Sequence, residues 1–194
     1  MATALVTGAT AGIGESFTRL LAQQGYDLVL VARDVKRLAE RAKFLRGKYN
    51  IKVEIIVADL SKNNELEKVV KRLTNPKNPV EVLINNAGFG LKKSFLTSKS
   101  KDERALLDVL VTAPMTLSHA VLPFMKARNS GRIINVSSVA SWIAGGTYSA
   151  AKSYVTVFSE SLHSELRGTN IKVTALCPGF THIDSLCLPI FKTK

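Results

Sequence analysis

The sequence predicts an α/β fold in which a parallel sheet of about six strands is covered by helices on both faces. Short runs rich in valine, isoleucine and leucine recur along the chain, and helical stretches separate them. These runs are apolar at nearly every position, so they suit strands that are buried on both faces. A chain of 194 residues is long enough for one well-buried domain.

The apolar runs and the helical stretches alternate from the first residues to the last predicted strand. The predicted strands are Thr3–Val6, Leu28–Val31, Val53–Val57, Val80–Ile84, Arg132–Val136 and Ile171–Leu176. The predicted helices are Ile13–Gln24, Val35–Tyr49, Asn64–Leu73, Lys101–Lys126 and Thr147–Leu166. No repeat and no linker rich in Pro, Gly or Ser divides them, so we expect a single domain over 1–180 and a short apolar tail over 181–194.

Composition narrows the class of protein. With 46% hydrophobic and 22% charged residues, the chain is typical of a globular protein. No apolar run reaches the roughly 18 residues of a membrane span, and the start leads directly into a strand, so we expect no membrane association, no secretory signal and a cytoplasmic location. Cys177 and Cys187 are expected to be reduced, and the scattered His119, His163 and His182 predict no metal site.

The net charge of +12 raises nucleic-acid binding as an alternative. The basic residues, however, are spread along predicted helical faces and one loop, without interleaved aromatic residues. A solvated face is therefore favoured and no nucleic-acid partner is predicted, although the charge would attract anionic ligands.

A glycine-rich loop, Thr7 to Gly14, joins the first strand to the first helix. Its glycines would permit a tight turn, close approach of the backbone to a phosphate, and packing of the helix against the strand. The helix N-terminus would then offer free N–H groups and a positive dipole end to a pyrophosphate. The loop predicts a dinucleotide site.

The residues after the second strand indicate which dinucleotide is preferred. An acid there usually holds the ribose 2′-hydroxyl of NAD, whereas an arginine accommodates a 2′-phosphate. Here the strand ends at Ala32 and Arg33, and Asp34 could cap the next helix. NADP(H) is favoured over NAD(H), with a surface role for Arg33 as the alternative.

Turn residues follow the third and fourth strands. Asp59, which precedes Leu60, could accept a hydrogen bond from an adenine amino group. Ala87 and Gly88 would let a ribose or ring lie against the backbone, while Asn85 and Asn86 could tie neighbouring strand ends together. Each could equally be a plain turn residue.

The stretch from Arg132 to Arg167 predicts proton chemistry. Ser138 follows the apolar strand, and Tyr148 and Lys152 stand four residues apart at the start of a helix, so both face the same side. A phenol titrates near 10, and a neighbouring ammonium favours its ionised form. Such pairs also arise by chance, so this spacing alone does not establish a catalytic pair.

Taken together, these residues resemble the short-chain dehydrogenase/reductase family. The matching parts are the Thr7-to-Gly14 loop, Asp59, Asn86-Ala87-Gly88, Ser138, Tyr148-Ser149-Ala150-Ala151-Lys152 and Pro178-Gly179, in the family's order. The resemblance covers nearly the whole chain and implies a Rossmann-like doubly wound sheet.

The resemblance also implies roles. Tyr148 would exchange a proton with the substrate oxygen, Ser138 would polarise that oxygen, and Lys152 would hold the nicotinamide ribose while lowering the tyrosine pKa. Cofactor contacts are implied for Gly8, Thr10, Gly12, Ile13, Gly14, Arg33, Asp59, Leu60, Asn86, Ala87, Gly88, Tyr148, Lys152, Pro178, Gly179 and Thr181.

Two departures from the family pattern bear on activity. Leu110 stands where the family commonly has an asparagine that helps to hold a water near the lysine, so Leu110→Asn is expected to raise turnover. The chain after Gly179 is shorter than is usual, which would leave Ile171–Leu176 at a sheet edge and predicts marginal stability or self-association.

The sequence therefore predicts an NADP(H)-dependent oxidoreductase that acts on a small carbonyl or alcohol substrate. NAD(H) remains possible as cofactor. The alternative is a catalytically impaired or non-catalytic member of the family that binds nucleotide or associates through its surface. A homodimer or homotetramer is implied by the resemblance alone.

Overall fold

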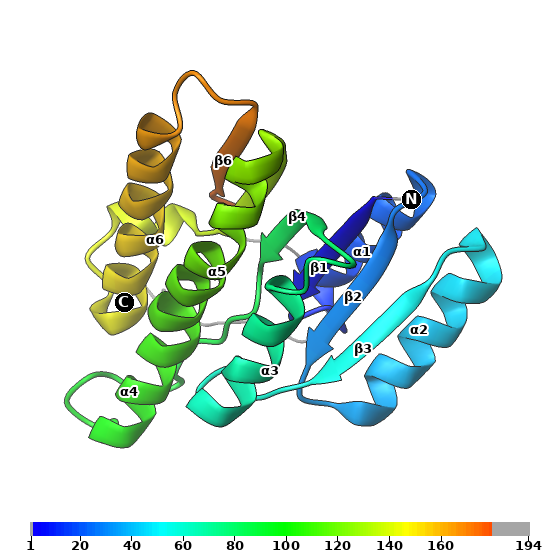
Figure 1. The fold of residues 1–194 in the computed structure, drawn as a ribbon. Coiled ribbons are helices and arrows are strands. Elements are labelled where there is room, and N and C mark those ends of the chain that lie inside the picture. The colour runs from blue at the N-terminus through cyan, green and yellow to red at the C-terminus, as the bar shows by residue number, and fades with distance from the viewer. Residues whose placement is uncertain (1, 180–194) are drawn as a thin grey trace.

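The structure, a computed structural model, describes residues 2–179 (Figure 1). Its strands are β1 (Thr3–Thr7), β2 (Asp27–Ala32), β3 (Val53–Val57), β4 (Val80–Asn85), β5 (Gly131–Val136) and β6 (Ile171–Leu176). Its α-helices are α1 (Gly12–Gln23), α2 (Val35–Tyr49), α3 (Asn63–Leu73), α4 (Ser100–Leu107), α5 (Ala113–Arg128) and α6 (Gly146–Glu165).

The strands form one parallel sheet in the order β3-β2-β1-β4-β5-β6. The chain first moves outward from β1 to β3 and then crosses back to β4, so the direction of winding changes between β1 and β4. Such a switch point leaves a crevice at the carboxyl ends of the strands. The predicted α/β fold with a doubly wound sheet is confirmed.

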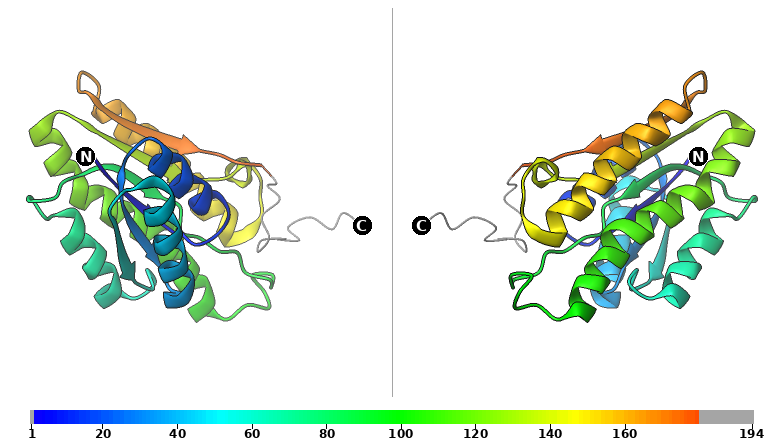
Figure 2. Two further views of the ribbon diagram at one scale, coloured as in Figure 1. Left: turned by 90° about the vertical axis from the view of Figure 1, so that its right-hand side faces the viewer. Right: turned by 90° about the vertical axis from the view of Figure 1, so that its left-hand side faces the viewer.

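Helices cover both faces of the sheet, and each layer encloses an apolar core. Figure 2 views the layers from opposite sides, with α1 and α2 in front in the left view and α5 and α6 in front in the right view. Leu21, Leu38 and Leu45 fill the core beneath α1 and α2. Val69 and Leu117 belong to the core beneath α3 and α5. The continuous apolar strands thus contact apolar helix faces on both sides.

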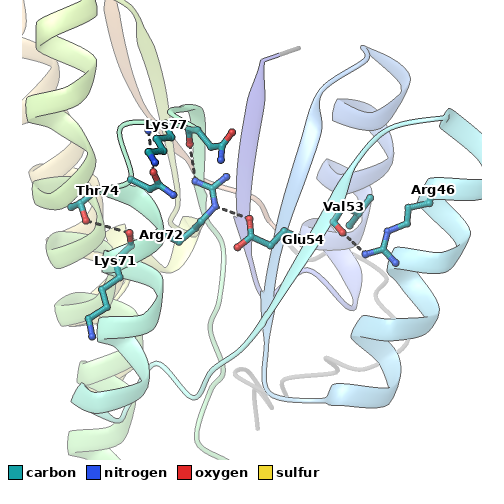
Figure 3. Close-up of polar contacts among 9 residues, drawn as sticks. Arg46, Val53, Glu54, Lys71, Arg72, Thr74 and Lys77 are labelled. Carbon is teal, nitrogen blue, oxygen red and sulfur yellow. Dashed lines mark hydrogen bonds and ion pairs between the residues drawn. The ribbon is translucent and has the colours of Figure 1, made fainter.

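Two arginines hold the edge strand β3 between its neighbouring helices (Figure 3). Arg46 of α2 donates to the backbone oxygen of Val53. Arg72 of α3 donates to the Glu54 carboxylate at 2.7 Å and to the backbone oxygen of Asn78 at 2.8 Å. Charged side chains at a sheet edge discourage pairing with another chain, so this edge is protected.

The predicted helix Lys101–Lys126 is not continuous. A π-helical segment, Asp108–Thr112, separates α4 from α5. One stretch, Ser100–Arg128, is long and apolar enough to cross a membrane by length and composition alone. Leu117, Val121 and Met125 of this stretch are fully buried in the core, which explains its apolar character.

The far edge of the described sheet is β6, as predicted, and its last residue, Leu176, is 37% exposed. The predicted apolar tail lies outside the described residues. The expected self-association or marginal stability stays a prediction.

Candidate active site

A cavity of about 750 Å³ lies at the carboxyl ends of the strands. It runs from the N-terminus of α1, across the switch between β1 and β4, to the N-terminus of α6. Most of the residues singled out in the sequence line it: Gly8, Thr10, Gly12, Ile13, Arg33, Asp59, Leu60, Asn86, Ala87, Gly88, Ser138, Tyr148, Lys152, Pro178 and Gly179. Residues far apart in the chain therefore share one site.

The glycine loop is packed so closely that two of its glycines admit no side chain. A β-carbon on Gly14 would lie 2.2 Å from the backbone oxygen of Gly8. Gly8 has a φ of +65° and would bring a β-carbon within 2.8 Å of the Asn86 Nδ2. That nitrogen donates to the backbone oxygens of Thr7 at 3.0 Å and Gly8 at 3.2 Å. Asn86 thus holds the loop as well as lining the cavity.

The first turn of α1 is suited to an anion. The residue before the helix, Ala11, makes no side-chain capping bond, and Gly12 and Ile13 line the cavity. Unpaired N–H groups at a helix N-terminus, with the positive end of the dipole, attract phosphate. The loop and helix therefore fit the pyrophosphate of a dinucleotide.

Two arginines line the cavity beyond the end of β2. Arg33 is exposed, as is Arg37, whose Nη2 donates to the backbone oxygen of Thr10 at 2.9 Å. Asp34 caps α2, because its Oδ1 accepts from the backbone N–H of Arg37 at 3.0 Å. With the acid used as a cap, this end of the cavity offers guanidinium groups, which match phosphate geometry.

Asp59 is held as a hydrogen-bond acceptor at the end of β3. Its Oδ1 accepts from the Ser61 hydroxyl at 2.8 Å and the Ser61 backbone N–H at 3.1 Å. Burial raises the pKa of Asp59, but these bonds and the attraction of Arg33 and Lys62 leave the pKa below its usual value. The carboxylate is therefore ionised at neutral pH and able to accept from an amino group.

Ser138, Tyr148 and Lys152 converge at the other end of the cavity. Ser138 lies two residues beyond β5 and caps a short 3-10 helix, Val139–Trp142, by accepting from the Ala140 N–H at 3.1 Å. Lys152 is 5% exposed, its Nζ donates to the backbone oxygen of Val136 at 2.7 Å, and it lies 5.7 Å from the Tyr148 ring centroid. The Tyr148 and Lys152 side chains thus face the same space, as their spacing on the helix predicts.

Burial controls the ionisation of both groups. It raises the pKa of Tyr148, against a smaller lowering by the nearby Ser138 hydroxyl. It lowers the pKa of Lys152 to about 8, against a smaller raising by Cys177. The net direction at Tyr148 is opposite to the lowering expected from Lys152, because desolvation of the phenolate outweighs the other influences. Tyr148 is therefore a neutral phenol at pH 7, ready to donate a proton.

Comparison with known proteins agrees with this geometry. Residues 2–186 match the family model described as short chain dehydrogenase. The chain belongs to the short-chain dehydrogenase/reductase family. An uncharacterized oxidoreductase of Staphylococcus saprophyticus is 34% identical over 91% of this chain and 76% of its own length. An NADP-dependent 3-hydroxy acid dehydrogenase of Escherichia coli K12 is 35% identical over 90% of this chain and 71% of its own.

Solved structures of this family superpose closely on the chain. A bulky-bulky ketone specific alcohol dehydrogenase from Comamonas testosteroni has a TM-score of 0.91 at 34% identity, with 94% of this chain and 74% of that chain covered. A short-chain dehydrogenase from Sphingobium yanoikuyae, in complex with NADPH, also has a TM-score of 0.91 at 34% identity, with coverages of 95% and 73%. The predicted enzyme class, an NAD(P)-dependent short-chain dehydrogenase/reductase, is confirmed.

Two of the residues assigned to the cofactor differ from the rest. Gly14 is not among the residues that line the cavity, and it serves the packing of α1 against the loop. Thr181 lies outside the described residues. The individual roles of the catalytic and cofactor-binding residues of this short-chain dehydrogenase/reductase stay predictions.

Several lining residues were not singled out in the sequence. Arg37 lies in the first turn of α2. From sequence alone, a basic residue there is expected to belong to the solvated face of the helix. Phe89, Val139 and Ile143 form an apolar wall around the Tyr148 end of the cavity. The sequence does contain a signal for Arg37, namely its position four residues after Arg33. A residue in the first turn of the helix that follows Arg33 can face the same strand end.

Leu110 lies in the π-helical segment, at the position where the family commonly has an asparagine. It is 2% exposed and packs with Leu106 and Ala151, with Tyr148 against the same cluster. A β-carbon on Gly88 would lie 2.9 Å from the Leu110 Cδ2 and 4.0 Å from the Lys152 Nζ, so the leucine and the ammonium both approach Gly88. π-Helical turns are frequent at functional sites, and here one presents an apolar side chain.

Proposed function

We propose that this protein is an NADP(H)-dependent oxidoreductase that interconverts a small carbonyl compound and its alcohol. The observation that carries the proposal is the convergence of Ser138, Tyr148 and Lys152 at one end of a cavity whose other end is the glycine loop. A dinucleotide bound along this cavity would bring its nicotinamide to the tyrosine end.

The residues of the chain would supply orientation and the proton. In the direction of reduction, the Tyr148 hydroxyl donates its proton to the substrate oxygen, while the Ser138 hydroxyl donates a hydrogen bond to the same oxygen. Lys152 holds the ribose hydroxyls, and its positive charge stabilises the phenolate that remains. The nicotinamide, when bound, supplies the hydride.

The preference for NADP(H) is supported by the end of β2. Ala32 adds no negative charge there, Asp34 is used as the cap of α2, and Arg33 and Arg37 face the same end of the cavity. The names of two relatives point the same way, since one is called NADP-dependent and one was solved with NADPH. NAD(H) would lack the phosphate that these arginines are suited to bind.

Cofactor titration followed by a carbonyl screen tests the proposal. We expect NADPH to bind more tightly than NADH, and Arg33→Ala to reduce that difference. With an active carbonyl, Tyr148→Phe should keep the NADPH affinity and lower kcat by about 10²–10⁴-fold, the usual contribution of a positioned proton donor. Turnover that survives Tyr148→Phe would refute the role of the tyrosine, and NADPH binding without any Tyr148-dependent turnover would support a non-catalytic member of the family.

Two further expectations stay predictions. A cytoplasmic location rests on the sequence alone. A homodimer or homotetramer through the long helices is supported by Tyr154 and Val157 of α6, which are 38% and 63% exposed. The elution volume and scattered-light mass of the purified protein would decide the second.

A further inference from the structure

The most exposed large apolar side chains of the described residues gather on one side of the molecule. They are Leu96, Phe95 and Trp142, which are 94%, 68% and 68% exposed. Phe95 and Leu96 belong to the loop between β4 and α4, and Trp142 ends the 3-10 helix before α6. Figure 2 shows that these two segments project from the same side of the molecule. Apolar side chains that are exposed together mark an interaction surface.

Hydrogen bonds within the loop hold Phe95 and Leu96 on the outside of a turn. The backbone N–H groups of Thr97 and Ser98 donate to the Ser94 backbone oxygen at 3.0 Å and 2.9 Å. The Ser98 hydroxyl donates to the Phe95 backbone oxygen at 3.1 Å. The turn thus pairs its own backbone groups and leaves both apolar side chains in solvent.

Four lysines flank this turn in the chain, and all four are exposed. They are Lys92, Lys93, Lys99 and Lys101. Among residues 2–179, none of the four forms an ion pair. The acids of the same segment, Asp102 and Glu103, are half-buried. The surroundings of the apolar turn are therefore positively charged.

This combination of charge and apolar surface matches one kind of partner. In an anionic lipid bilayer, negatively charged head groups cover an apolar layer, and basic and apolar side chains together bind such an interface. Tryptophan is also favoured there, because its ring is apolar and its N–H can reach water. A second copy of the chain docked through the same loop would bring lysines against lysines, which opposes association.

We propose that this side of the protein docks on an anionic lipid bilayer. Phe95 and Leu96 enter the apolar part of the interface, Trp142 lies at the level of the head groups, and the four lysines contact the lipid phosphates. The absence of membrane association expected from the sequence rested on the lack of a spanning run, whereas this contact is made at the surface. The docking does not depend on the proposed function.

The active-site cavity opens on the same side. Phe89, at the start of the loop, lines it, and so do Val139 and Ile143, which are neighbours of Trp142 in the chain. A docked protein would therefore present the apolar wall of its cavity to the bilayer. If the proposed function holds, an apolar carbonyl compound dissolved in the lipid could enter from there.

Vesicle binding tests the docking directly. Trp142 is the one tryptophan of the sequence, so the fluorescence of the protein reports on this surface. The purified protein is mixed with vesicles of phosphatidylcholine, either alone or with about one-third phosphatidylglycerol. We expect it to sediment with the anionic vesicles only, and the Trp142 emission to shift to shorter wavelength. No sedimentation, or sedimentation without this shift, would overturn the proposal.

A pair of charge variants separates docking from general attraction by the net charge of +12. Lys92→Gln with Lys93→Gln should weaken binding to the anionic vesicles about 30-fold, because each lysine near an anionic surface contributes about 1 kcal/mol. Lys68→Gln with Lys71→Gln removes the same charge from exposed positions of α3 and should bind like the wild type. Equal losses in the two double variants would overturn the proposal.

Replacing Leu96 tests the apolar contact. Leu96→Ser should weaken vesicle binding about 10-fold or more and leave the free energy of unfolding unchanged, because the side chain is 94% exposed. Leu20→Ser, at a 49% exposed position of α1, is the matched control and should bind vesicles normally. A scattered-light mass of a dimer that Leu96→Ser converts to a monomer would assign the loop to an interface between copies and overturn the proposal.

Discussion

Replacing Leu110 by asparagine tests how far the apolar wall beside Lys152 limits the enzyme. The leucine is 2% exposed and packed against Leu106 and Ala151, so the substitution removes a fully buried side chain and buries an amide instead. We expect the free energy of unfolding to fall by about 2–5 kcal/mol. For a chain of this size that corresponds to a decrease in Tm of roughly 4–20 °C.

The same substitution places an amide oxygen near the Lys152 ammonium, which Leu110 approaches across Gly88. A hydrogen bond to a charged group contributes about 1.5–3 kcal/mol, so the pKa of Lys152 should rise by about one to two units from its value of about 8. The ammonium then persists to higher pH. We expect kcat for carbonyl reduction to rise, and most clearly at about pH 9.

The assay is NADPH oxidation across the pH range at a temperature where urea titration shows each variant to be folded. Leu106→Asn makes the same change in the same apolar cluster without lining the active-site cavity, so it should lose stability without gaining turnover. If the folded Leu110→Asn enzyme is no faster than the wild type at any pH, the reasoning about the apolar wall is refuted.

Three other outcomes follow from single contacts. Gly14→Ala should abolish nucleotide binding or folding, because its β-carbon would lie 2.2 Å from the Gly8 backbone oxygen. Gly47→Ala is the control: Gly47 has open space around it inside α2, so the substitution should raise the free energy of unfolding in urea titrations by about 0.5–1 kcal/mol. Arg37→Ala should weaken NADPH about 10-fold or more and NADH much less, and equal losses measured by fluorescence titration would exclude a phosphate contact. The folded chain lowers the pKa of Lys152 to about 8 from 10.5, so between those values the unfolded chain binds more protons and this group makes the free energy of unfolding rise with pH. Denaturation at a series of pH values should show this slope up to about pH 9.5, and Lys152→Met should remove it.

The sequence predicts the regular elements well where local chemistry sets their ends. Helix α2 has the predicted bounds, because Asp34 caps its start and Asn50, with a φ of 52°, ends it in the left-handed conformation. The π-helical segment at Asp108–Thr112 was not predictable, because the apolar periodicity continues through it and only the packing around Leu110 shows the change.

In the candidate site, too, the sequence predicts the residues that local chemistry constrains and misses the contacts between distant parts of the chain. Gly8, Tyr148 and Lys152 were predictable because turn chemistry and helical spacing constrain them within a few residues. Asn86 holds the glycine loop from roughly 80 positions away in the chain, and the Asn85 Nδ2 donates to the Asn135 Oδ1 of the neighbouring strand. No local pattern encodes such contacts.

The buried hydrogen bond from the Asn85 Nδ2 to the Asn135 Oδ1, at 2.8 Å, has a consequence for the internal motions of the protein. The Asn135 Nδ2 donates to the Ser159 Oγ at 2.9 Å, and that hydroxyl donates to the Val155 backbone oxygen at 2.7 Å. A chain of buried hydrogen bonds therefore connects β4, β5 and α6. Segments joined by buried hydrogen bonds open together, and their amides exchange with solvent slowly. The first half of α6 should therefore exchange its amides with β4 and β5 as one cooperative unit, more slowly than its own C-terminal turns. Local opening motions would then widen the nucleotide end of the cavity before they changed the distance between Tyr148 and Lys152.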